Sequence, residues 1–133
     1  MTVNRGRIDR GKQTQLIVAR DWYAVQGWPL CEPVGGGRQG RDITGMPGLF
    51  CEVKAERGWR PTTWLRQHEV RAGVPLWVIQ RPDGYGPANL AEWPVIMRLD
   101  QHTALLQAAG YPTEGTPICV ELPTVSPSAQ QPS

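Results

Sequence analysis

Apolar side chains recur at helical spacing in three stretches of the chain, and residues that favour helix ends flank each stretch. The first stretch ends before Gly27, the second begins at Pro61, which suits a first helical position, and the third follows Asp100, a capping residue. The pattern therefore predicts helices over residues 9–26, 61–73 and 100–109.

Shorter apolar segments between these helices are typical of strands. The glycine-rich run at residues 35–40 cannot hold a helix and predicts a loop, and the turn formers from Gly45 to Gly48 predict a hairpin between two central strands. The strands are expected at residues 30–34, 41–44, 49–55, 76–80 and 95–99. The order is then α-β-β-β-α-β-β-α, which predicts an α/β sandwich with a central mixed sheet flanked by helices.

The length of the chain suits one domain, since 133 residues can bury a sufficient core. Residues 1–8 are polar and basic and are expected to form a flexible arm, and the proline-containing residues 123–133 a disordered tail. The folded domain is expected to span residues 9–122.

No apolar run approaches the roughly 20 residues that cross a bilayer, and no apolar stretch follows the basic N-terminus as in a secretory signal. We therefore expect a cytoplasmic protein without a membrane partner. The three cysteines are widely spaced and lack a paired motif, which argues against a disulfide framework and a zinc site.

The net charge of +2 is unevenly distributed. Residues 1–71 hold twelve Lys and Arg against seven Asp and Glu, or +5, whereas residues 72–133 hold two against five, or −3. A face that binds a polyanion such as DNA would therefore be built mainly from the N-terminal half. Ordinary solvated arginines would give the same count, so charge alone leaves both interpretations open.

Glu52 and Lys54 lie two residues apart on an expected strand, so their side chains leave the same face. If Asp42 on the preceding strand pairs across from this segment, its carboxylate comes beside Glu52, and the two carboxylates provide hard oxygen ligands for Mg²⁺. A lysine next to such a metal suits phosphodiester hydrolysis, because it can orient the nucleophile or stabilise developing charge. An acid followed at a distance by Glu-x-Lys also occurs by chance on half-exposed strands.

Asp42, nine intervening residues and then Glu52-Val53-Lys54 resemble the PD-(D/E)XK nuclease superfamily, with Arg41 in place of the motif's proline. The stretch GGGRQGRDITGMPGLFCEVKA, followed by residues 64–67, is most similar to small Holliday-junction-resolvase-like endonucleases of phages. The resemblance covers roughly residues 10–110.

This resemblance implies a restriction-endonuclease-like fold and a homodimer that cuts a four-way DNA junction with Mg²⁺, or with Mn²⁺ as a substitute. Asp42 and Glu52 would be metal ligands together with the carbonyl of Val53, and Lys54 a catalytic base or electrostatic stabiliser. If the protein is encoded by a phage, it would act in the cytoplasm of the bacterial host.

Two glutamines bear on this resemblance. Gln15 stands where such nucleases often carry an acid on the first helix, and its amide oxygen can still coordinate a metal but supplies no charge. Gln67 resembles a glutamine that the family places near the active site, where an amide could position water or the scissile phosphate, although a solvated helix residue would look the same.

Basic residues near the motif could contact phosphates. The candidates for DNA binding are Arg5, Arg7 and Lys12 in the arm and first helix, and Arg38, Arg41, Arg57 and Arg60 around the motif. Trp28 and Trp59 border loops and could stack on unpaired bases, whereas His68 and His102 are too isolated in the sequence to suggest ligands.

Three alternatives to a junction resolvase remain open from the residues alone. The chain could be a non-cleaving protein that binds structured DNA on a nuclease fold, which Gln15 would favour. It could be a nuclease for flaps, nicked duplexes or foreign duplex DNA. It could also have a purely structural or protein-binding role, which a failure to bind any nucleic acid would indicate.

Overall fold

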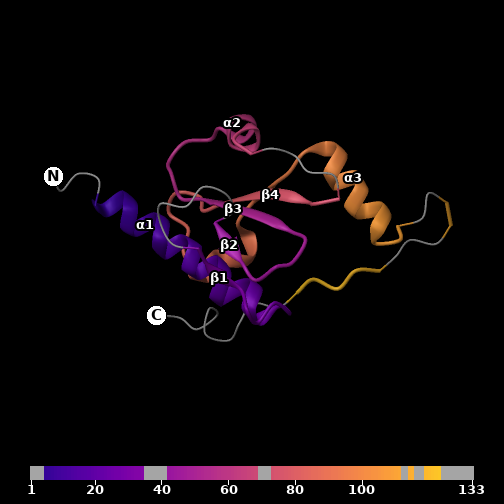
Figure 1. Ribbon diagram of the computed structural model, residues 1–133, viewed down its shortest axis with the longest axis horizontal. Helices are drawn as coiled ribbons and strands as arrows, with labels where there is room; N and C mark the ends of the chain where they lie inside the picture. The colour runs from indigo at the N-terminus through magenta and orange to yellow at the C-terminus, as the bar shows by residue number, and fades with distance from the viewer. Residues whose placement is uncertain (1–4, 35–41, 69–72, 112–113, 116–118, 124–133) are drawn as a thin grey trace.

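The computed structural model describes residues 5–34, 42–68, 73–111, 114–115 and 119–123, with side chains from residue 9 onward. Figure 1 shows the arrangement of its helices and strands. In chain order they are α1 (Arg5–Leu16), η1 (Ile17–Trp22), η2 (Tyr23–Val25), β1 (Glu32–Pro33), β2 (Ile43–Thr44), β3 (Phe50–Lys54), α2 (Pro61–Arg66), β4 (Leu76–Gln80), η3 (Pro87–Glu92), β5 (Val95–Ile96) and α3 (Leu99–Ala108).

The first helical segment runs on from α1 through a π-helical turn, η1, and a 3-10 turn, η2. It ends close to the predicted stop, because Gln26 caps the last turn and Gly27 takes a φ of 123°. Its start is earlier than predicted: α1 begins at Arg5, so residues 5–8 of the expected flexible arm belong to the helix. Residues 1–4 lie outside the described part of the chain.

The main sheet has three strands in the order β3-β4-β5. β3 and β4 are parallel, with Glu52 opposite Val78, and β4 and β5 are antiparallel. All five residues of the central strand β4 are buried. The protein is therefore an α/β protein with a mixed sheet, as the sequence predicts.

The predicted hairpin between residues 41–44 and 49–55 is wrong. β2 pairs with β1 in a separate antiparallel two-stranded sheet, in which Glu32 lies opposite Thr44. The turn after β2 packs closely on the chain before β1, so a Cβ at Gly45 would lie 2.2 Å from the Leu30 carbonyl oxygen. Buried Met46 also joins the core cluster, and these contacts direct β2 away from β3.

The two faces of the main sheet have different neighbours. Cys51, Val53, Trp77 and Ile79 belong to a core cluster with the first helical segment, whose Tyr23 hydroxyl accepts a hydrogen bond from the Trp77 indole at 2.9 Å. Glu52 and Lys54 leave the opposite face, over which α2 lies in Figure 1. Helices therefore cover both faces of the sheet.

The C-terminal part of the described chain differs from the prediction in two places. The 3-10 helix η3 was not predicted, and Asp100 is not the cap of the last helix, since α3 begins at Leu99 with Arg98 as its N-cap. The Asp100 carboxylate instead accepts hydrogen bonds from Arg98 and from the Gln101 backbone N–H. No helix within the described ranges is long and apolar enough to cross a membrane.

Candidate functional site

Asp42 is joined to the edge of β3 by its side chain. Its Oδ2 accepts a hydrogen bond from the Val53 backbone N–H at 2.9 Å, while its own carbonyl oxygen accepts one from Val34 N–H. Because β3 pairs with β4 on one edge only, the Val53 N–H is left for this carboxylate. The expected approach of Asp42 to the Glu-x-Lys strand is therefore made by a side chain and not by strand pairing.

Glu52 is a buried acid whose side chain lies against Asp42. It is 4% exposed, and its Oε1 has no hydrogen-bond partner in the described structure. Burial, and next the hydrogen bond and negative charge of Asp42, raise the pKa of Glu52 to about 9. Near neutral pH Glu52 therefore keeps its proton.

His68 also reaches Glu52, which sequence reasoning missed because the two residues are far apart along the chain. The His68 Nε2 lies 3.3 Å from Glu52 Oε2, an ion-pair distance without hydrogen-bond geometry, and its ring centroid lies 5.1 Å from that of Phe50. Burial, and next the charge of Lys54, lower the pKa of His68. A neutral imidazole therefore stands beside the protonated Glu52 at pH 7.

Lys54 and Gln67, which the sequence singled out separately, interact with each other in the structure. The Lys54 Nζ donates a hydrogen bond to the Gln67 Oε1 at 2.8 Å. Gln67 follows the last turn of α2, which ends at Arg66 rather than near Gly73. The amide thus fixes the position of the ammonium group close to the end of β3.

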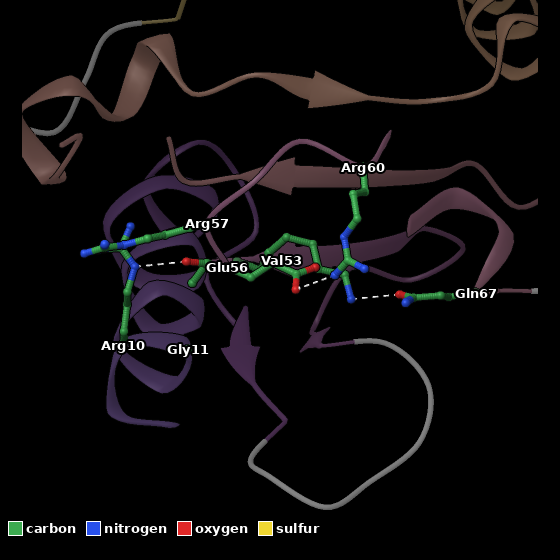
Figure 2. A pocket seen from close by; sticks show the side chains of 9 residues that line it. Arg10, Gly11, Val53, Glu56, Arg57, Arg60 and Gln67 are labelled. Atoms are coloured by element: carbon green, nitrogen blue, oxygen red, sulfur yellow. Dashed lines mark hydrogen bonds and ion pairs between the residues drawn. The ribbon is translucent and has the colours of Figure 1, made fainter. Parts of the chain in front are cut away.

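A cavity of about 860 Å³ opens at the end of β3. Its lining residues come from α1, β3 and the connection to α2, and they are Arg10, Gly11, Val53, Lys54, Ala55, Glu56, Arg57, Arg60 and Gln67. Figure 2 shows Arg10 and Gln67 on opposite sides of this cavity, with Val53 between them. Four cationic side chains and one carboxylate surround the space, which favours an anionic ligand.

Arg10 and Arg81 are further cations near the site that the sequence did not single out. The Arg10 Nε donates a hydrogen bond to the Ala55 carbonyl oxygen at 2.9 Å, so the guanidinium is fixed beside the end of β3. Burial, and next the charge of Arg10, lower the pKa of Arg81. Buried Thr14 holds Arg81 in place, with its hydroxyl 3.2 Å from the guanidinium.

The donor set at Asp42 and Glu52 fits a hard divalent cation. Both carboxylates meet at the edge of β3, and the Val53 carbonyl leaves this edge as well, because the N–H and C=O of one residue in a strand point the same way. The Glu52 Oε1 has no hydrogen-bond partner among the described residues, so it could bind a cation once the carboxyl group gives up its proton. Among the described residues no group of three or more His, Cys, Asp or Glu side chains is placed to hold a metal, so water would have to complete the coordination.

Gln15 lies half-buried on α1. Within the ranges described, the structure records no hydrogen bond from its amide to Asp42 or Glu52. Its assignment as a metal ligand thus stays a prediction.

The predicted DNA-binding residues fall into four groups. Arg57 and Arg60 line the cavity, whereas Lys12 is exposed on α1 and does not line it. Arg38 and Arg41 lie outside the described residues, and Arg5 and Arg7 belong to the first turn of α1 without a described side chain. Two of the seven are thus placed at the site.

Comparison of the chain with protein-family models, with curated proteins and with solved structures returned no match.

Proposed function

We propose that the protein is a metal-dependent endonuclease that hydrolyses phosphodiester bonds in branched DNA, with a restriction-endonuclease-like fold and the action of a Holliday junction resolvase. The observation that carries this proposal is the pair of carboxyl groups of Asp42 and Glu52, which lie together at the edge of β3. Lys54, two residues after Glu52, lines the cavity beside them. Burying two acids side by side is unfavourable for folding unless a cation or a proton lies between them. Such a pair is typical of a site that binds Mg²⁺ or Mn²⁺.

The roles of the residues follow from their positions. Asp42, Glu52 and the Val53 carbonyl would hold the metal, whose charge stabilises the phosphoryl group as the bond breaks. Lys54 would bind the phosphate or stabilise the developing negative charge, and Gln67 keeps its ammonium group in place through the 2.8 Å hydrogen bond. Arg57 and Arg60 in the cavity would bind neighbouring phosphates.

His68 would orient the Glu52 carboxylate through its contact at 3.3 Å. Groups that hold a ligating carboxylate from behind commonly tune metal affinity. The proposed resolvase would act as a homodimer, since paired incisions require two active sites. It would work in the cytoplasm, in a bacterial host if a phage encodes it.

The alternative is a protein that binds branched DNA without cutting it. The neutral Gln15, which stands where the resemblance expects a third acid, favours this alternative. A nuclease for flaps or duplex DNA would use the same residues on a different substrate.

The test is cleavage of a labelled four-way junction beside linear duplex of matching sequence, with and without Mg²⁺ or Mn²⁺. Wild type is compared with Asp42→Asn and with Glu92→Gln, which alters an exposed acid outside the cavity. We expect paired cuts in the junction that need the metal, disappear in Asp42→Asn and persist in Glu92→Gln. Junction binding without cuts under any metal would establish the alternative, and cuts that survive in Asp42→Asn would refute the assigned site.

A further inference from the structure

The connection between β3 and α2, residues 55–60, is held firmly although it contains no helix or strand. The two oxygens of Glu56 accept hydrogen bonds from the indole of fully buried Trp64 and from the Arg60 guanidinium, the latter at 2.9 Å. The Gln80 amide donates a hydrogen bond to the Gly58 carbonyl oxygen at 3.2 Å. The loop is thus fixed both to α2 and to the central strand β4.

This fixed loop exposes a large aromatic side chain. Trp59 is 57% exposed, and its ring contacts Trp64 edge to face, with centroids 5.9 Å apart and an interplanar angle of 84°. An exposed indole gains none of the stabilisation that burial would give, and the hydrogen bonds of Glu56 and Gly58 hold the loop that carries it. The indole surface is therefore available for a ligand with a flat apolar face.

The neighbours of Trp59 are cations that face the cavity. Arg57 and Arg60, two residues before it and one after it, both line the cavity, and Arg10 lines it from α1. Arg57 has only a weak, exposed ion pair with Asp83 at 3.6 Å. Trp59 is thus an exposed indole between two cationic side chains that line the cavity, although it does not line the cavity itself. Exposed aromatic side chains beside a cationic groove are the arrangement by which proteins hold single-stranded nucleic acid.

We propose that residues 55–60 bind an unpaired nucleotide of DNA, with its base stacked on Trp59 and the adjoining phosphates bound by Arg57, Arg60 and Arg10. The placement of this nucleotide next to the scissile phosphate rests on the proposed nuclease function. The stacking itself does not, since it needs neither the metal nor Asp42. Branched DNA would supply this nucleotide where base pairs at the branch open.

The experiment measures binding in EDTA by fluorescence anisotropy of two labelled DNA strands of equal length, about ten nucleotides. One is an oligothymidylate, and the other has abasic sites throughout, so the two differ in bases but not in phosphates. Wild type should bind the thymidylate roughly five- to a hundredfold more tightly, as expected for one stacked base. An oligouridylate should bind no more tightly than the thymidylate, and clear preference for it would assign the site to RNA.

Four variants identify the residues responsible. Trp59→Leu should lose the preference for bases and keep the affinity for the abasic strand, while Trp59→Phe, which can still stack, should retain most of the preference. Tyr111→Leu is the matched control, because Tyr111 is a partly exposed aromatic that lies after α3, outside the loop at residues 55–60. Arg57→Ala should weaken both strands equally and reduce the salt dependence of binding by about 0.7 in the logarithmic slope, since Arg57 has only an exposed ion pair and does not hold the loop.

The outcomes separate this inference from the proposed function. A wild type without preference for bases, or a preference that survives in Trp59→Leu, would overturn the nucleotide site even if the protein cuts junctions. Preference for bases that depends on Trp59 in a protein that never cuts would support the nucleotide site and refute the nuclease. Thermal unfolding confirms that each variant is folded before its binding is measured.

Discussion

Replacing Glu52 by glutamine should make the metal-free protein more stable at neutral pH. The ordinary pKa of this carboxyl group is 4.5, and the fold raises it to about 9. The folded state therefore binds the proton more tightly than the unfolded state does. The stability that depends on this proton is complete below pH 4.5 and is lost as the pH rises through about 9.

The size of the effect follows from this difference. Within that window the free energy of unfolding falls with each pH unit, by about 2–3 kcal/mol in all between pH 5 and pH 7. The side chain introduced by Glu52→Gln is a neutral amide of the same shape that can still donate a hydrogen bond to Asp42, and it has no proton to lose. The variant should therefore be more stable than wild type at pH 7 and nearly equal to it at pH 5.

The assay is urea unfolding in EDTA at several pH values between 5 and 8. His68 contributes with the opposite sign, since its pKa is lowered in the folded state, so its stabilisation is complete above its ordinary pKa of 6.5 and is lost as the pH falls. Both proteins contain His68, so most of its contribution cancels when the free energy of unfolding of wild type is subtracted from that of Glu52→Gln. Glu92→Gln, which changes an exposed glutamate, should leave the profile parallel to that of wild type.

A profile of Glu52→Gln that runs parallel to wild type between pH 5 and pH 7 would refute the reasoning. It would mean that Glu52 is ionised in the folded protein at neutral pH and is not strained by Asp42. The central argument for a cation between the two carboxylates would then lose its basis.

Two further predictions concern the framework of the site and are measured by urea unfolding. Gly45→Ala should lower the free energy of unfolding by more than about 3 kcal/mol, because the new Cβ would meet backbone atoms within 3 Å at a φ of +89°. Gly48 has the same sign of φ but open space around it, so Gly48→Ala should lower it by about 1–2 kcal/mol. Equal losses would show that β2 does not pack as described. Thr14→Val should lower the free energy of unfolding by about 1–3 kcal/mol, since the buried Thr14 hydroxyl donates a hydrogen bond to the helix backbone and accepts one from Arg81. Thr103→Val removes only an exposed hydrogen bond to the backbone of α3, so it should lower it by less than about 0.5 kcal/mol. A loss at Thr103 as large as that at Thr14 would contradict the role of Arg81.

The positions of most helices and strands could be predicted from local pattern. The apolar stripe before Gly27 and the buried run at residues 76–80 are signals of spacing and turn chemistry that act over a few residues. Both were confirmed, as was the α/β class with a mixed sheet. Asp42, Glu52 and Lys54 were singled out from their spacing, and the structure places the first two in contact and Lys54 at the cavity.

The pairing of the strands could not be predicted in the same way. Residues 41–55 contain the turn formers of a hairpin, but Gly45 and Met46 pack against the chain before β1, so β2 joins β1 and leaves the edge of β3 open. That open edge is what gives Asp42 its bond to the Val53 N–H. The pairing of β2 with β1 thus explains both why the predicted hairpin is wrong and why the Asp42 side chain reaches the strand that carries Glu52.

The sequence by itself determined where most of the regular elements lie and which residues are candidates for the chemistry, because residue type and short spacing decide both. Only the tertiary structure decided that His68 meets Glu52, that Arg10 reaches Ala55 and that Trp59 stays exposed on a fixed loop. The contact of Arg10 with Ala55, for example, joins segments 45 residues apart. Such contacts depend on how helices and strands pack together, which the spacing of residues along the chain does not specify.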